Sequence, residues 1–327
     1  MRVALVHDDL AQWGGAERVL LAISEVFPEA PIYTSVFDRD NQLLEQSFGS
    51  KKIITSFMQK IPGWKDLYKT LLPLYPTAFE QFDFSGFDLV ISHTTRFAKS
   101  IITKPSTKHI CYCHTPPRFL WNFSGESVGG ILSPYISFLR VYDTISANRV
   151  DNWIAGSHNA ASRIKKVYHS DAQVLQPFVD LDDFRDLESF DGGYFLMISR
   201  LNKYKRVDLA VNVFNHLDAR LKIVGVGPDL VALQKMAKPN IEFLGAVPEN
   251  IKLNLLSGCK ALIVTAEEDF GLTPLEAQQC GKPVIAYGRG GALETVINDK
   301  TGIFFAEQTV ESLRSALDKF ARIKFSK

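Results

Sequence analysis

The chain has 327 residues, with 37 Lys and Arg against 36 Asp and Glu. This near balance argues against a nucleic-acid-binding protein, because such proteins carry a marked basic excess. The length suffices for two domains of ordinary size, and the composition, 46% hydrophobic and 22% charged, is typical of soluble globular proteins.

The amino-terminal sequence predicts a strand over Arg2–His7. Its apolar run is too short for a signal peptide and ends at Asp8 and Asp9. No stretch supplies the roughly eighteen consecutive apolar residues that a membrane span needs. We therefore expect a cytoplasmic protein, with the inner face of the plasma membrane as an alternative location.

Strands and helices alternate along the first half of the chain. A helix is predicted over residues 16–27, because Val19, Leu20, Ile23 and Phe27 recur at helical spacing. Further strands are predicted at residues 31–37, 87–93, 108–113 and 152–157. The two cysteines of the strand at 108–113 face one side without further metal ligands nearby, so we expect buried, reduced thiols and no metal site.

A second cycle begins near residue 194. Strands are predicted at residues 194–199, 220–225, 240–245, 260–265, 282–287 and 302–306, and helices at residues 206–217, 228–237 and 311–323. The acidic, Gly-Gly-containing segment 176–193 between the cycles predicts a linker. We expect an α/β protein of two Rossmann-like domains, 1–177 and 178–327, whose ligands bind in a cleft at the carboxyl ends of the strands.

The strongest signal of function lies between Glu267 and Val296. Glu268 follows the strand at 260–265, and Glu276 comes eight residues later in a helix whose first turn suits Pro274. Gly271 would let backbone amides approach an anion at the start of this helix. A sugar diphosphate fits this arrangement, although either glutamate alone is more often a helix-capping acid.

Two cations follow the strand at 194–199. Arg200 and Lys205 would suit a diphosphate whose charge grows as its bond to a sugar breaks. A solvated basic turn is the alternative. Gly225, after the next strand, would bring the backbone close to a nucleotide or form a tight turn.

Candidate residues of the first half also follow strands. Gly14 and Gly15 lack the spacing of the dinucleotide fingerprint, which disfavours an NAD enzyme. His114 follows the strand at 108–113, although a lone histidine is often structural. Asp8 and Asp9 would touch an acceptor, with helix capping or surface roles equally plausible.

The Glu268–Glu276 segment resembles the E-x7-E motif of glycosyltransferase family 4, whose fold is called GT-B. The sequence PVIAYGRGGALETV matches family sequences too, and HTPPR resembles a variant found in mannosyltransferases of the family. The resemblance implies transfer of a hexose, with retention of configuration and without a metal, from a nucleoside-diphosphate sugar. GDP-mannose is the expected donor and a saccharide or lipid-linked saccharide the expected acceptor.

The resemblance also implies roles for individual residues. Glu268 would contact the donor sugar, Glu276 the ribose hydroxyls, and His114 the transferred sugar. Arg118 would meet a phosphate of the acceptor or the donor. The expected catalytic residues are His114, Glu268, Arg200 and Lys205; the expected donor-binding residues are Gly14, Gly15, Gly225, Val247, Phe270, Gly271, Leu272 and Glu276.

Two alternatives to this function stay open at this point. One is a sugar-nucleotide epimerase or a phosphorylase on a similar fold, and the other an inactive carbohydrate-binding relative. Residues 51–79 mix lysines with aromatic side chains. They predict either an amphipathic segment on an anionic membrane surface or a helix pair packed on the domain.

Overall fold

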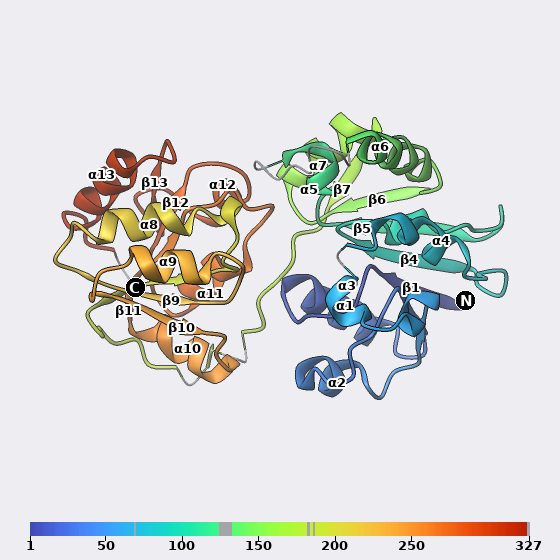
Figure 1. Ribbon diagram of the computed structural model, residues 1–327, viewed down its shortest axis with the longest axis horizontal. Helices are drawn as coiled ribbons and strands as arrows, with labels where there is room; N and C mark the ends of the chain where they lie inside the picture. The colour runs from blue at the N-terminus through green and yellow to red at the C-terminus, as the bar shows by residue number, and fades with distance from the viewer. Residues whose placement is uncertain (69, 124–132, 182–183, 186, 326–327) are drawn as a thin grey trace. The chain divides into compact units, whose positions relative to one another are not determined.

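The computed structural model describes residues 1–327 except 69, 124–132, 182–183, 186 and 326–327. The chain divides into two compact units, Met1–Pro177 and Phe178–Lys327 (Figure 1). Each unit contains one parallel sheet with helices packed against it. The expected α/β architecture of two Rossmann-like units is thereby confirmed.

In the described part of the first unit, seven parallel strands form a sheet in the order β3-β2-β1-β4-β5-β6-β7. Their bounds are β1 Val3–His7, β2 Ile32–Thr34, β3 Ile53–Thr55, β4 Leu89–Thr94, β5 Lys108–Cys113, β6 Asn152–Ala155 and β7 Ala172–Val174. The strands β1 and β4 are buried along almost their whole length, because helices cover both faces of the sheet. Leu5 packs into one hydrophobic cluster, while Ala4 and Val6 pack into another on the opposite face.

The helices of the first unit vary in length from one turn to four. They are α1 Gly15–Val26, α2 Gln42–Phe48, α3 Trp64–Leu67, α4 Tyr75–Glu80, α5 Arg118–Trp121, α6 Ser133–Ala147 and α7 His158–Tyr168, with the 3-10 turns η1 Phe57–Lys60, η2 Leu72–Leu74 and η3 Ala98–Ser100. Asn41 and Ser157 cap α2 and α7 by accepting a backbone N–H, as short polar side chains do at helix starts.

In the second unit, six parallel strands of the described chain form a sheet in the order β10-β9-β8-β11-β12-β13. Their bounds are β8 Tyr194–Ile198, β9 Arg220–Val224, β10 Ile241–Gly245, β11 Cys259–Val264, β12 Val284–Tyr287 and β13 Gly302–Phe305. The helices are α8 Val207–Phe214, α9 Leu230–Met236, α10 Glu249–Gly258, α11 Leu272–Gln279, α12 Ala292–Thr295 and α13 Val310–Phe320, with the 3-10 turn η7 Lys203–Lys205.

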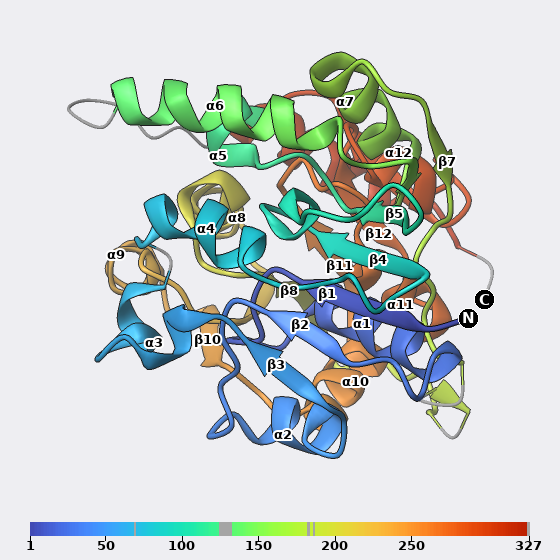
Figure 2. The same ribbon diagram turned by 90° about the vertical axis from the view of Figure 1, so that its right-hand side faces the viewer.

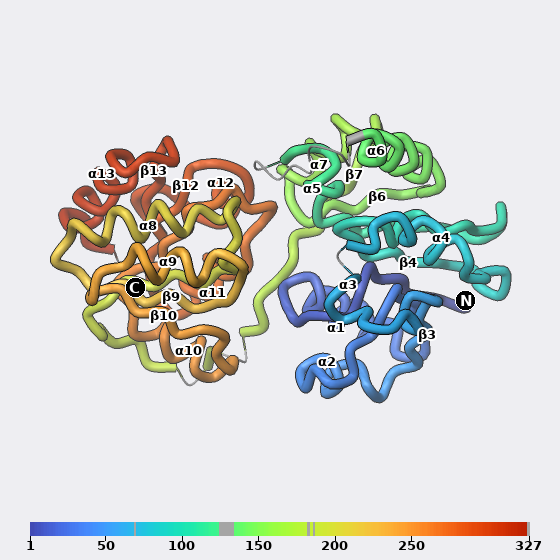
Figure 3. The backbone as a smooth tube through the Cα atoms, in the orientation of Figure 1, coloured from blue at the N-terminus to red at the C-terminus, as the bar shows by residue number. Residues whose placement is uncertain are grey.

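Each sheet reverses its strand order once. In the first, the chain runs from β1 out to β3 and returns to β4, so that β1 and β4 are neighbours with His7 opposite His93 (Figure 2). The tube in Figure 3 follows the same path. In the second unit, β8 and β11 are the corresponding neighbours. Ligands of such sheets bind beyond the carboxyl ends of the strands at this reversal.

Segment 51–79 is neither one amphipathic helix nor a helix pair, because it holds β3, η1, α3, η2 and α4. Met58 and Tyr68 are buried in a hydrophobic cluster of the first unit, and Phe57, Trp64 and Leu72 pack against it. The apolar side chains that a membrane would have to take up are therefore largely engaged in the core. The structure favours the alternative of packing on the domain.

Part of the predicted linker 176–193 packs against the second unit. Phe184 and Leu187 pack against a core cluster there. The Gly192 N–H donates to the Gly258 carbonyl at 2.8 Å. The short edge strands β3 and β7 were not predicted.

Candidate active site

Lys205 and Glu268 meet at the strand-order reversal of the second sheet. Lys205 ends η7, after β8, and Glu268 lies in the loop after β11. The Lys205 Nζ lies 2.5 Å from Oε1 and 2.7 Å from Oε2 of Glu268. The Thr265 hydroxyl donates to the Lys205 carbonyl at 2.7 Å, which fixes the two loops to each other. Two residues predicted separately thus form one charged pair.

Arg200 occupies the loop between β8 and η7 and is exposed. This loop rests directly on Gly225, where an added Cβ would lie 1.8 Å from the Ser199 carbonyl oxygen. Gly225 also has a φ of +136°, which only glycine adopts readily. Its missing side chain therefore admits the protein's own backbone, and this packing positions Arg200.

Glu276 lies in α11 with 3% of its surface exposed. Its Oε1 is 2.9 Å from the Nζ of Lys252, which extends from α10 and also pairs with Glu249 at 2.5 Å. Lys252 was not predicted, since a single lysine in a helix carries no motif. The pair gives this buried carboxylate a partner, as a buried charge requires.

The loop Phe270–Leu272 is fixed from two sides. Gly271 precedes α11 with a φ of +92°, and Phe270 is buried. An added Cβ on Gly291 would lie 2.2 Å from the Phe270 Cα, and the Gly291 N–H donates to the Glu268 carbonyl at 2.7 Å. Gly291, the last glycine of the GRGG sequence, thus allows close packing against this loop. Val247 follows β10, and its side chain packs against a core cluster.

Three histidines converge at the strand-order reversal of the first sheet. His7 ends β1, His93 lies opposite it in β4, and His114 follows β5. The His7 Nδ1 lies 2.9 Å from the His93 Nδ1, and the His93 Nε2 lies 2.7 Å from the His114 Nε2. On α1, Glu17 places its Oε1 3.6 Å from the His7 Nε2. Of these groups, only His114 had been predicted as a site residue, in contact with the transferred sugar, and the cluster itself had not been predicted.

Asp8 has a structural role that its sequence position did not reveal. Its two carboxylate oxygens accept hydrogen bonds from the backbone N–H groups of residues 95–98, at 2.6 to 2.9 Å, and from the hydroxyls of Thr94 and Thr95. Burial opposes ionisation, but Arg96, His7 and the backbone donors outweigh it and hold the pKa of Asp8 below its usual value. The side chain organises the segment after β4.

Asp9 is buried beside Arg96, with its Oδ2 3.0 Å from the guanidinium. Burial raises the pKa of Asp9 above its usual value. Within the described chain its Oδ1 accepts no hydrogen bond.

The other predicted residues of the first unit lie at helix starts. Gly14 and Gly15 lie at the start of α1, and Arg118 begins α5.

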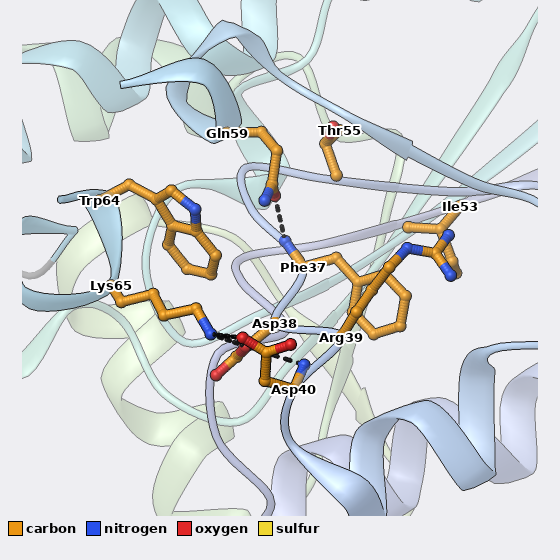
Figure 4. Close-up of a pocket in the computed structure, with 9 residues that line it drawn as sticks. All are labelled: Phe37, Asp38, Arg39, Asp40, Ile53, Thr55, Gln59, Trp64 and Lys65. Carbon is orange, nitrogen blue, oxygen red and sulfur yellow. Dashed lines mark hydrogen bonds and ion pairs between the residues drawn. The ribbon is translucent and has the colours of Figure 1, made fainter. Parts of the chain in front are cut away.

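A pocket of about 270 Å³ opens beyond the ends of β2 and β3 (Figure 4). Trp64 forms an aromatic wall, and Gln59 accepts the Phe37 N–H at 2.6 Å. The Lys65 ammonium pairs with Asp38 at 2.6 Å and with Asp40 at 2.5 Å. The pocket shares its sheet edge with the histidines and had not been predicted.

Cys111 and Cys113 are buried and not disulfide-bonded, and burial raises the pKa of Cys111 to about 12. Among the described residues, no group of three or more His, Cys, Asp or Glu side chains is placed to hold a metal ion.

No helix in the described part of the chain has the length and apolar character to span a membrane.

Two family models match the chain. The model described as Glycosyltransferase Family 4 covers residues 13–183, and the model described as Glycosyl transferases group 1 covers residues 181–324. The chain is 26% identical over 372 residues to the alpha-1,3/1,6-mannosyltransferase ALG2 of Mus musculus, over 97% of this chain and 87% of that protein. With alg2 of Schizosaccharomyces pombe the identity is 25% over 363 residues, or 92% and 70% of the two chains.

Solved structures share the fold at lower identity. The Anabaena protein HepE in complex with UDP has a TM-score of 0.69 at 19% identity, over 98% of this chain and 90% of that one. Sucrose-phosphate synthase from Thermosynechococcus elongatus has a TM-score of 0.72 at 15% identity, with the same coverage. These likenesses establish the fold alone.

Proposed function

Because this chain belongs to glycosyltransferase family 4, a family of enzymes with the GT-B fold and nucleotide-sugar donors, we propose that it transfers mannose from GDP-mannose to a lipid-linked saccharide. The mannosyltransferase relatives, aligned over more than nine-tenths of the chain, support mannose as the sugar. The Lys205–Glu268 pair at the strand-order reversal is the observation that carries the proposal. An epimerase, a phosphorylase or an inactive relative is not favoured.

The second unit binds the donor in this account. Lys205 and Arg200 stabilise the negative charge that builds on the diphosphate as the sugar leaves. Two cations can take the place of a metal ion in this role, and we propose that no metal is required. Glu268 orients the Lys205 ammonium and offers its carboxylate to the sugar hydroxyls.

The nucleotide lies beyond α11 and β10. The Glu276 carboxylate accepts hydrogen bonds from the ribose hydroxyls, and the ion pair with Lys252 orients it. The amides of Phe270, Gly271 and Leu272 point to the diphosphate from the start of α11, where the helix dipole favours negative charge. Main-chain groups around Val247 contact the base.

Transfer proceeds with retention at the anomeric carbon. Retaining glycosidases use two carboxylates about 5 Å apart, one of them a nucleophile. Here each glutamate of the E-x7-E motif pairs with its own lysine, Glu268 with Lys205 and Glu276 with Lys252. A front-side displacement therefore fits better, in which the departing diphosphate accepts the proton of the acceptor hydroxyl.

The first unit binds the acceptor. His114 contacts the transferred sugar, and Gly14, Gly15 and Arg118 lie at the same sheet edge near the phosphates. The pocket with Trp64 supports a saccharide site there, because an aromatic wall with a few polar groups suits a sugar ring. A lipid-linked acceptor implies peripheral contact with the cytoplasmic membrane face, which flotation with anionic vesicles tests.

A thermal-shift panel tests the donor site. The purified protein is heated with GDP, UDP, ADP and their sugars, without metal and with EDTA. We expect GDP and GDP-mannose to raise the Tm, because a ligand that binds only the folded state stabilises it. No stabilisation by any nucleotide, or stabilisation only when metal is added, contradicts the proposal.

A further inference from the structure

An unbroken chain of imidazoles connects Glu17 to His114. The contacts are 3.6 Å from Glu17 to His7, 2.9 Å from His7 to His93, and 2.7 Å from His93 to His114. A neutral imidazole has one N–H and one acceptor nitrogen, so a ring that donates on one side accepts on the other. The direction of each hydrogen bond in the chain is therefore fixed by its neighbour.

The three histidines His7, His93 and His114 have two possible proton arrangements. When His7 carries two protons, its Nε2–H faces Glu17 and its Nδ1–H donates to the Nδ1 of His93. His93 then donates from Nε2 to His114, which holds its own proton on Nδ1. When His7 is neutral, its proton stays on Nε2 facing Glu17. His93 now donates from Nδ1 and accepts at Nε2, and His114 carries its proton on Nε2.

We propose that Glu17, His7, His93 and His114 form a proton-conducting chain in which the protonation of His7 sets the tautomer of His114. The conversion balances: one proton moves from His7 to His93, a second moves from His93 to His114, and a third leaves the Nδ1 of His114. One proton is released in all, and His114 is neutral in both arrangements, because its Nδ1 proton leaves as the proton from His93 arrives at its Nε2. His93 is a positioning residue, and the Glu17–His7 pair stores the proton.

The geometry places the charge at the Glu17 end. Burial lowers the pKa of His7, but Glu17, Asp8 and Asp9 together outweigh it and raise this pKa above 6.5. The Nδ1–H of charged His7 is shared between the nearer His93 Nδ1, at 2.9 Å, and the His93 carbonyl, at 3.2 Å. Burial, with the neighbouring His114 and His7, lowers the pKa of His93, so the middle ring stays neutral and can only relay.

Other charged and titrating groups lie beside the three histidines. Tyr112 of β5 stacks on His93 with 5.4 Å between ring centroids, and burial raises its pKa beyond the range in which histidine titrates. After β4, Arg96 is paired with Asp9, and the Asp8 carboxylate is engaged by backbone amides. Within the described part of the protein, the charged and titrating groups placed beside these histidines include Glu17, Asp8, Asp9, Arg96 and Tyr112.

The proposed mannosyltransferase activity gives the chain its use, since His114 would present a donor or an acceptor to the sugar according to the state of His7. The test does not depend on that activity. Two-bond ¹H–¹⁵N spectra of the full chain distinguish the Nδ1–H, Nε2–H and charged forms of each of its seven histidines. Single His→Gln variants assign the signals.

In the wild-type protein we expect one shared transition with a midpoint above pH 6.5, the ordinary value for histidine. As the pH rises through it, His7 loses its charge and His114 changes from the Nδ1–H to the Nε2–H form. The proposal is overturned if His114 keeps one tautomer while His7 titrates, or becomes charged at a pH of its own.

Two variants and one control variant sharpen the result. Glu17→Gln should move the shared midpoint down by about one pH unit or more, because a carboxylate beside an imidazole favours its charged form. Glu25→Gln, an exposed change on the same helix, should not move it. In His93→Phe, His7 should still titrate while the His114 tautomer no longer follows. If the His114 tautomer still changes with the charge of His7 in that variant, the two residues are not coupled through His93.

Discussion

Lys205 and Glu268 form a two-pronged ion pair, although 63 residues separate them in the chain. One follows β8 and the other β11, which are neighbours only because the strand order reverses between them. The pair holds an ammonium group in one orientation at the place where ligands of such sheets bind. A preorganised cation of this kind stabilises a developing charge without having to move during the reaction.

Replacement of Lys205 tests this role. Lys205→Met should lower kcat/KM for mannose transfer by about 10²- to 10³-fold, the loss typical for one preorganised group at a developing charge. Lys203→Met, an exposed lysine on the same turn, is the matched control and should stay near wild type. Equal effects of the two changes in steady-state kinetics would contradict a specific role of Lys205.

Glu276→Gln should weaken GDP binding by about 10- to 100-fold, since hydrogen bonds to a charged group contribute about 1.5–3 kcal/mol. The Tm without nucleotide should change little, because Lys252 keeps Glu249 as its partner. Isothermal titration with GDP measures the Kd. An unchanged Kd together with a lowered kcat would move Glu276 from nucleotide binding to the chemical step.

Asp8→Asn should destabilise the protein by about 3–5 kcal/mol, because an amide group then faces donors that a buried carboxylate satisfied. The pKa of Asp8 lies below 3.8 in the folded protein, so its contribution is complete above that pH and is lost as the pH falls through the folded value. The stability difference between wild type and variant, from urea unfolding at several pH values, should therefore shrink in acid. A difference independent of pH would be inconsistent with this assignment.

Gly225→Ala and Gly245→Ala are a matched pair of variants. Gly225→Ala forces a Cβ to within 1.8 Å of the Ser199 carbonyl, so the loop that carries Arg200 must move and donor turnover should fall at least tenfold. Gly245 also has a positive φ, of +68°, but an added Cβ meets nothing within 4 Å. Gly245→Ala should cost about 1–2 kcal/mol of stability with turnover preserved. Urea unfolding and kinetics of both variants provide the check; equal turnover would refute the packing argument.

The pocket of the first unit can be tested through Trp64. Trp64→Ala should raise the KM for the saccharide acceptor about two- to tenfold, since contacts to an aromatic face contribute about 0.5–1.5 kcal/mol. The KM for GDP-mannose should not change, because Trp64 is not one of the proposed donor-binding residues. A rise in both values would point to general loss of structure, which circular dichroism and the Tm of the variant would reveal.

The sequence was sufficient to predict where in the fold candidate residues lie when they follow long, apolar strands. Arg200, Lys205 and Glu268 follow β8 and β11 as expected, and Pro274 lies in the first turn of α11. Their placement depends only on local hydrophobic patterns, and such patterns are readable along the chain.

Contacts set by sheet order could not be predicted in the same way. The partnership of His7 and His93, and that of Asp8 with the segment after β4, arise because β1 and β4 are neighbours. Lys252 contacts Glu276 because α10 packs on α11. Nothing in the residues themselves marks these partners, since a lone lysine or histidine is compatible with many surroundings.

Incubation of the enzyme with GDP-mannose and a lipid-linked oligosaccharide acceptor, in the presence of EDTA, tests the central claim most directly. The account predicts a product that is larger by one hexose, whose new linkage is α by NMR, and whose formation is reduced in Lys205→Met but not in Lys203→Met. A β linkage, transfer only from UDP- or ADP-sugars, or an equal rate in Lys205→Met would contradict it.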